Sequence, residues 1–244
     1  MLSRLRRWPG HHVSTLALLF ALVPLGASVR APRARRAVAS EGALARPLSH
    51  AASEPARRTI RRTVAEHGVG TYIGEMLAGR DSALARWPDR EGRPLRVWVQ
   101  PSAPVGDRDI GYVRQVRDAF REWDALQLPI RFAFTGDSAH ADVHVTFIDH
   151  FDEAISGRTR WVRDDDWWIT DADIVLATHH HGGDSLDADA MRAMSLHEIG
   201  HLLGLDHTAN SANVMAPRVR VRALSSADRA TARLLYALPP GALR

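Results

Sequence analysis

Apolar and polar residues alternate in several short stretches of the chain, as they do in β-strands with one buried face. The stretches with this pattern are "LRVWVQ" (95–100), "IRFAFT" (130–135), "ADVHVTFI" (141–148), "GRTRWV" (157–162) and "ITDADIVLAT" (169–178). The last two flank the turn-like sequence "RDDDWW", so we expect them to form a hairpin. The alternation therefore predicts a sheet in the middle of the chain.

Three other stretches repeat apolar residues every three or four positions, which is typical of helices with one buried face. They cover residues 109–126, about 189–203, and 224–238. Asp187 or Asp189 is expected to cap the second helix, and Ser225 the third. A mixed sheet followed by two helices predicts an α+β domain at residues 93–244.

The first 28 residues have the pattern of an export signal. An apolar run at 13–25 follows a basic start and precedes the small residues Gly26, Ala27 and Ser28. The basic start consists of Arg4, Arg6 and Arg7. Because the run is short for a membrane-spanning helix, we expect a secreted or periplasmic protein without stable membrane insertion after cleavage. An uncleaved signal would instead anchor the protein in the membrane.

Two segments separate this signal from the predicted sheet. Residues 29–58 are rich in Arg, Ala, Pro and Ser, which predicts a linker or disordered segment. Residues 59–92 show a helical pattern that is interrupted at Gly68 and Gly70. This second segment is either a removable pro-segment or a brace on the main domain, and the sequence does not choose between them.

Composition and charge exclude several classes of function. The chain has no cysteine, so disulfides, thiolate metal sites and a cysteine nucleophile are excluded. Residues 1–96 hold 17 of the 32 basic residues and 7 of the 28 acidic ones, so residues 97–244 carry a net negative charge. The predicted domain thus lacks the basic surface of a nucleic-acid-binding protein.

The stretch "SLHEIGHLLGLDH" carries the chemistry of a metal centre. His197 and His201 are four residues apart, so a helix places both imidazoles on one face, where they can bind one zinc ion. Glu198 has the place of the general base in the H-E-x-x-H pattern. Gly204 allows the chain to leave the helix and bring His207 back as a third ligand. Three protein ligands with one open position are typical of catalytic rather than structural zinc.

The pattern extends to H-E-x-x-H-x-x-G-x-x-H, with Met215 eight residues beyond the third histidine, and it argues against a merely structural role for the histidines. "HEIGHLLGLDH" followed by "NVMAP" resembles the catalytic core of the matrixins, in a bacterial-type version. The resemblance covers about residues 94–238 and is strongest from 195 onward. It implies a metzincin-like α+β domain with a twisted mixed sheet, an active-site helix and a C-terminal helix, with Met215 beneath the zinc.

Further metal sites are left open by the sequence. His150 and Asp152 resemble one half of the structural zinc site of matrixins, but the partner histidines are not visible. The run "THHHGGD" at 178–184 is either a second metal site or a solvated loop. The acids Asp184, Asp187 and Asp189 either bind calcium or cap a helix. The cofactor expected here is thus one catalytic Zn²⁺, with Ca²⁺ or a second Zn²⁺ as open alternatives.

The expected function is that of a secreted zinc endopeptidase acting on protein or peptide substrates. An extended peptide is expected to pair with an exposed edge strand near 157–163. The candidate substrate-binding residues are Arg158, Thr159, Arg160 and Trp161 on that strand, and Pro217 and Val219 after Met215. The alternatives are a non-catalytic zinc-containing peptide-binding protein of the cell envelope, and an amide hydrolase of narrow specificity. The sequence does not determine the oligomeric state.

Overall fold

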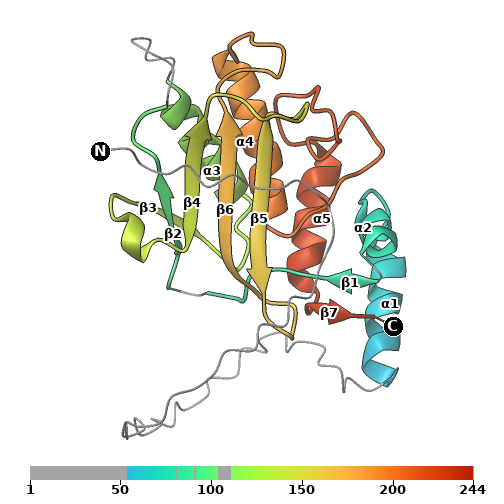
Figure 1. Ribbon diagram of the computed structural model, residues 1–244. Helices are drawn as coiled ribbons and strands as arrows, with labels where there is room; N and C mark the ends of the chain where they lie inside the picture. The colour runs from blue at the N-terminus through green and yellow to red at the C-terminus, as the bar shows by residue number, and fades with distance from the viewer. Residues whose placement is uncertain (1–53, 81, 91, 104–110, 244) are drawn as a thin grey trace, which may run out of the picture. The chain divides into compact units, whose positions relative to one another are not determined.

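The computed structural model describes residues 54–80, 82–90, 92–103 and 111–243. A five-stranded mixed sheet with the strand order β3-β2-β4-β6-β5 forms the centre of this part of the chain (Figure 1). Its strands are β2 (Leu95–Val99), β3 (Phe132–Thr135), β4 (Val143–Ile148), β5 (Gly157–Arg163) and β6 (Ile169–Ala177). The predicted α+β class and the five predicted strands are confirmed.

The sheet is parallel except at one edge. Strand β2 pairs in parallel with β3 and β4, and β4 pairs in parallel with β6. Strand β5 returns antiparallel to β6 as the predicted hairpin, with Thr159 opposite Ile174 and Trp161 opposite Ala172. Among the described residues β5 pairs with β6 alone, so the edge strand lies near residues 157–163, as expected.

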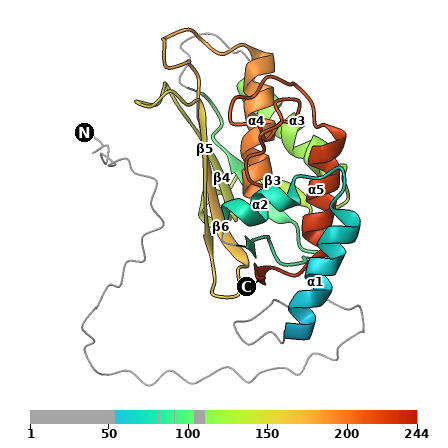
Figure 2. The same cartoon turned by 90° about the vertical axis from the view of Figure 1, so that its right-hand side faces the viewer.

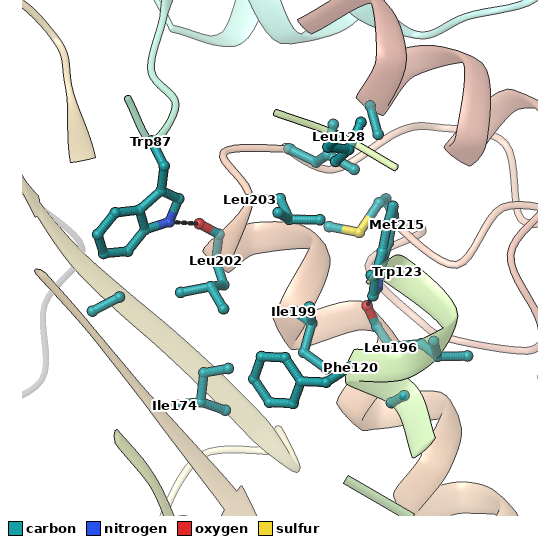
Figure 3. Close-up of a cluster of buried hydrophobic side chains, with 14 of the residues drawn as sticks. Trp87, Phe120, Trp123, Leu128, Ile174, Leu196, Ile199, Leu202, Leu203 and Met215 are labelled. Carbon is teal, nitrogen blue, oxygen red and sulfur yellow. Dashed lines mark hydrogen bonds between the residues drawn. The ribbon is translucent and has the colours of Figure 1, made fainter. Parts of the chain in front are cut away.

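Two helices, α3 (Tyr112–Asp124) and α4 (Ala188–Leu202), lie together against one face of the sheet (Figure 2). Asp187 caps α4 by accepting a hydrogen bond from the backbone N–H of Ala190 at 2.6 Å. Buried side chains from both helices and from β6 form the core that supports α4 (Figure 3). Within this core the indole N–H of Trp123 donates to the carbonyl of Leu196 at 2.9 Å.

The last helix, α5 (Ser226–Ala237), begins with the predicted cap. The hydroxyl of Ser225 accepts from the N–H of Asp228, and the carboxylate of Asp228 accepts from the N–H of Ser225, which makes a capping box. A short 3₁₀ helix, η1 (Ser138–His140), precedes β4. Both predicted C-terminal helices are thus present, and their starts are those that the capping residues indicate.

The N-terminal segment also contributes to the core. It contains α1 (Glu54–His67), α2 (Ile73–Gly79) and β1 (Ala83–Leu84), and β1 pairs with β7 (Gly241–Ala242). Helix α1 begins at Glu54, so residues 54–58, expected to belong to a linker, are helical instead because they continue the pattern of Ile60 and Val64. Met76, Leu84 and Trp87 are fully buried in the common core. The expected signal at 1–28 and the rest of the expected linker lie outside the described residues.

Within residues 54–243, apart from the gaps given above, no helix has the length and apolar character needed to cross a bilayer.

Candidate metal centre

Helix α4 and the turn after it bring the three predicted histidines together. His197 and His201 lie one turn apart on α4, and Glu198 lies beside them. The helix ends in a Schellman motif, in which the N–H of Leu205 donates to the carbonyl of Gly200 and the N–H of Gly204 to that of His201. Gly204 has φ +98°, a conformation that L side chains rarely adopt. The turn thereby returns His207 to the other two imidazoles.

The three imidazoles face one another through their Nε2 atoms. The distances are 3.1 Å between His201 and His197, 3.2 Å between His201 and His207, and 3.3 Å between His207 and His197. Two nitrogens bound tetrahedrally to zinc at about 2.0–2.1 Å lie about 3.3–3.4 Å apart, so the spacing fits one zinc ion. No other group of three such ligand residues occurs among the residues that the structure describes.

Backbone carbonyls set the tautomers of two of these histidines. Nδ1 of His197 lies 2.7 Å from the carbonyl oxygen of Val214, and Nδ1 of His201 lies 3.0 Å from that of Leu205. A carbonyl accepts only, so each Nδ1 carries the proton and each Nε2 presents a lone pair to its neighbours. Two lone pairs that face each other repel unless a cation lies between them. The donor set therefore fits a metal ion.

Burial keeps the imidazoles neutral, as metal ligands must be. Desolvation lowers the pKa of His197 to about 4 and lowers that of His201 well below its usual value. Desolvation also lowers the pKa of His207, although this side chain is more exposed. All three imidazoles are then unprotonated at neutral pH and available to zinc.

Glu198 is buried between α4 and β5. Desolvation raises the pKa of its carboxyl to about 7, against the opposing effect of a hydrogen bond from Thr159. The hydroxyl of Thr159 lies 2.6 Å from Oε2 of Glu198. An added Cβ at Gly157 would collide with Oε1 of the same carboxylate. Strand β5 therefore approaches the carboxylate closely and directs a hydroxyl donor at it.

Met215 lies in a buried turn that packs against α4. It is fully buried and lies near Trp123 and Leu203 (Figure 3). An added Cβ at Gly200 would collide with its sulfur, so α4 and the methionine turn touch at a position where only glycine fits. The preceding residue, Val214, supplies the carbonyl that orients His197. The turn thus supports the ligand helix both by packing and by a hydrogen bond.

The structure places the candidate substrate-binding residues around this centre in different ways. Thr159 directs its hydroxyl at Glu198, whereas Arg158 forms an ion pair with Glu153 at 2.9 Å. Trp161 lies under the guanidinium of Arg80, and Arg160 is exposed. Beyond the methionine turn, Pro217 is exposed and Val219 is partly buried against the core. A role for these residues in binding substrate stays a prediction.

Four of the residues that the sequence offers for further metals make other contacts. Nδ1 of His150 and Nδ1 of His179 lie 2.7 and 2.8 Å from the carboxylate of Asp149. Asp187 caps α4, and Asp189 forms an ion pair with Arg222. In this structure Asp187 is thus a helix cap and Asp189 an ion-pair partner, and calcium at these acids stays a prediction.

Comparison with known proteins agrees with this geometry. A mixed sheet, a ligand-bearing helix and a three-histidine cluster above a methionine turn define a metzincin-type zinc centre. The model of the matrixin family matches residues 101–237, which is more than half of the chain. The chain therefore belongs to the matrixin family of zinc metalloendopeptidases, and its three histidines are the ligands of the catalytic zinc.

Two relatives illustrate the distance within the family. The chain is 28% identical over 130 residues to "Matrix metalloproteinase-15" of Homo sapiens. This alignment covers 51% of this chain and 17% of the relative. The chain is 31% identical over 123 residues to "Metalloendoproteinase 1-MMP" of Arabidopsis thaliana. That alignment covers 43% of this chain and 31% of the relative. The chain thus aligns with less than a third of the length of either relative.

Three residues near the centre were not expected from the sequence. Tyr72, Glu75 and Arg80, in and next to α2, make hydrogen bonds to the segments that hold the histidines. They lie before the residues matched by the family model. No local pattern marks them, because their partners lie more than 120 residues further along the chain.

Proposed function

We propose that this protein is a zinc-dependent endopeptidase of the bacterial matrixin type that cleaves peptide bonds in proteins or peptides. The observation that carries the proposal is the buried carboxylate of Glu198, which lies beside the zinc ligands on α4 and accepts a hydrogen bond from Thr159 at 2.6 Å. Peptide binding alone does not require a carboxylate at this position, and burial raises the pKa of this one to about 7. A general base works best when its pKa lies near the working pH.

The proposed reaction divides the work between the metal and the protein. Zinc, when bound by His197, His201 and His207, supplies a Lewis acid that polarises a carbonyl and makes water more acidic. The carboxylate of Glu198 accepts a proton from the attacking water and then donates it to the leaving amine nitrogen. The hydroxyl of Thr159 keeps Oε2 of Glu198 in one orientation, so Oε1 is the oxygen available to the water.

The substrate is proposed to bind along β5. This strand has a neighbour on one side only, so the backbone of its other side can pair with an extended peptide. Arg158, Arg160 and Trp161 on β5, and Pro217 and Val219 after the methionine turn, are the proposed side-chain contacts. The pairing would place a scissile peptide bond beside Glu198, which β5 contacts directly.

The proposed place of action is outside the cytoplasm. The basic, apolar and small-residue sequence at 1–28 supports export and cleavage of a signal. The absence of cysteine means that folding in an oxidising compartment needs no disulfide. Edman sequencing of the protein recovered from the periplasm or medium of a bacterial host would locate the new N-terminus, and exclusive recovery in the cytoplasm would contradict the proposal.

The activity is tested with Glu198→Ala in the full chain. We expect the variant to keep zinc and to hydrolyse a peptide library about 100 to 10,000 times more slowly, the usual contribution of a general base. The unmodified protein should lose cleavage when a chelator is added. Full activity of the variant would refute the role of Glu198, and peptide binding without chelator-sensitive cleavage would favour the binding-protein alternative.

A further inference from the structure

Helix α2 and the residues on either side of it touch the supports of all three zinc ligands. The contacts come from Tyr72, Glu75 and Arg80 and reach the turn after α4, the loop after His207 and the methionine turn. These three residues precede the part of the chain that the family model matches. These contacts therefore bear on whether the N-terminal segment is a removable pro-segment or a part of the metal centre.

Arg80 makes the most contacts. Its guanidinium donates to the carbonyl of Gly204 at 2.7 Å and to that of Leu205 at 3.2 Å, and its Nε lies 2.9 Å from Oδ2 of Asp206. The carbonyl of Leu205 is the one that orients Nδ1 of His201. The other carboxylate oxygen of Asp206 accepts from the N–H of His207 at 2.8 Å. One side chain thus fixes the groups that hold two of the three ligands.

This arrangement is unusual for an arginine because the side chain is largely buried. Its exposed fraction is 16%, and desolvation lowers its pKa from the usual value. A buried charge costs free energy unless its hydrogen bonds are satisfied. Two carbonyls and one carboxylate meet this requirement, and the ring of Trp161 lies 5.4 Å from the guanidinium carbon. The turn after α4 is therefore held by a largely buried charged group with three hydrogen-bond partners rather than by a surface ion pair.

Glu75 holds the loop on the other side of His207. Its Oε2 accepts from the N–H of Ala209 at 2.7 Å, and its Oε1 accepts from the hydroxyl of Thr208 at 3.1 Å. With Arg80 bound to Asp206, the residues immediately before and after His207 are both tied to the same helix. The imidazole of His207 is the most exposed of the three, so it depends most on its backbone for its position.

Tyr72 extends the same support to His197 through two intermediate groups. Its hydroxyl donates to Oδ1 of Asp228 at 3.2 Å, and Oδ2 of Asp228 accepts from the N–H of Val214 at 3.0 Å. The carbonyl of Val214 is the acceptor for Nδ1 of His197. A continuous hydrogen-bonded path therefore joins Tyr72, at the start of α2, to His197.

We propose that Tyr72, Glu75 and Arg80 are positioning residues for zinc, and that residues 54–87 are a permanent part of the metal centre rather than a removable pro-segment. The segment stabilises the tautomers and the spacing of the imidazoles, although it lies outside residues 101–237, which the family model matches. An added Cβ at Gly204 would collide with the carbonyl oxygen of Ala85, which shows how closely the segment covers the turn. The proposal concerns the metal ligands and does not depend on peptidase activity.

The test measures zinc affinity in the full chain, with the metal alone as the probe. The variants are Arg80→Met, Glu75→Gln and Tyr72→Phe, each of which removes hydrogen bonds but keeps most of the side-chain volume. The zinc dissociation constant is obtained by competition with a chromophoric chelator. We expect Arg80→Met to weaken zinc binding by about 10- to 100-fold, the usual effect of removing a group that orients metal ligands. Glu75→Gln and Tyr72→Phe should have smaller effects in the same direction.

A matched pair of controls comes from the same segment. Arg62 and Glu66 on α1 form an exposed ion pair at 3.8 Å, so Arg62→Met and Glu66→Gln remove the same chemical groups without touching the centre. We expect their zinc affinity to stay within twofold of that of the unmodified protein. Equal losses in the controls and in Arg80→Met would overturn the proposal.

A second readout separates positioning from simple stabilisation. A residue that only stabilises the fold lowers the unfolding temperature of the zinc-free and zinc-loaded forms alike, whereas a positioning residue reduces the difference between them. The visible spectrum of the cobalt-substituted protein should also change in Arg80→Met, because it reports ligand geometry. If Arg80→Met fails to fold, Arg80→Lys and Glu75→Gln replace it. Unchanged zinc affinity and an unchanged cobalt spectrum in folded variants would overturn the proposal.

Discussion

Strand β5 and helix α2 both contact the metal centre, but they touch different atoms of it. Strand β5 reaches the carboxylate of Glu198, through the hydroxyl of Thr159 and the close approach of Gly157. Helix α2 and its flanks reach the groups behind the histidines, through Arg80 and Glu75. One region therefore acts on the general base and the other on the metal ligands.

The difference implies that metal binding and catalysis can be altered separately. A change in β5 should reduce turnover and leave zinc in place, because the contacts described for this strand reach Glu198. A change at the contact with α2 should loosen zinc or destabilise the turn that carries His207. The two glycines at these contacts, Gly157 and Gly204, allow the same substitution to be compared on both sides.

The largest effect is expected for Gly204→Ala. The residue has φ +98°, and an added Cβ would collide with the backbone carbonyl of Ala85, which cannot move aside as a side chain can. Strained backbone and overpacking each cost about 1–3 kcal/mol, so we expect the free energy of unfolding to fall by about 3 kcal/mol. Urea unfolding of the variant and of the unmodified protein measures this difference in the free energy of unfolding. Gly182→Ala is the control, since a Cβ there meets open space, and equal stability of the two variants would contradict the assigned contact.

A smaller effect, on activity alone, is expected for Gly157→Ala. The added methyl group would displace the Glu198 side chain and the sulfur of Met194, both of which can move. We therefore expect a folded protein whose kcat/KM is about 100-fold lower, because general bases must lie within hydrogen-bond reach of their proton. Peptide hydrolysis and zinc titration are measured on the same sample. A loss of zinc in place of turnover would show that the two regions are not separable.

The smallest effect is expected for Thr159→Val. The substitution keeps the shape of the side chain but removes the hydroxyl that lies 2.6 Å from Oε2 of Glu198. Without this donor the carboxylate is less firmly oriented, and we expect kcat to fall about tenfold, equivalent to about 1.4 kcal/mol. Thr159→Ser keeps the hydroxyl and should restore most of the activity. Equal rates for the valine and serine variants would place Thr159 outside the machinery.

The sequence predicted much of the fold and of the ligand set because those signals are local. His197, His201, Gly204 and His207 lie within eleven residues, so helical spacing and one glycine turn bring them together. Ser225 also marks its helix start within a few positions of itself. Patterns of this kind depend on neighbours along the chain, so they can be recognised without knowledge of the tertiary structure.

Contacts between distant segments were not predictable in the same way. Arg80 meets residues that follow it by 124 and 125 positions, and no periodicity relates two such positions. The orienting carbonyls of Val214 and Leu205 belong to the backbone and have no signature in residue identity. The sequence predicts a substrate contact for Thr159, whereas its place opposite α4 in the structure gives it a hydrogen bond to Glu198.

The pairing of β1 with β7 bears on the order in which the protein folds. Ala83 pairs with Ala242, so this ribbon joins segments from opposite ends of the described chain. Contacts that close such long loops form late, because the chain entropy that they cost must be compensated by structure already in place. The histidines, by contrast, lie within eleven residues of one another, so they can begin to bind zinc once α4 and the turn after it have formed. We expect metal uptake to precede the docking of residues 54–87. A newly made chain should therefore bind zinc weakly at first, and its zinc affinity should rise when β1 pairs with β7.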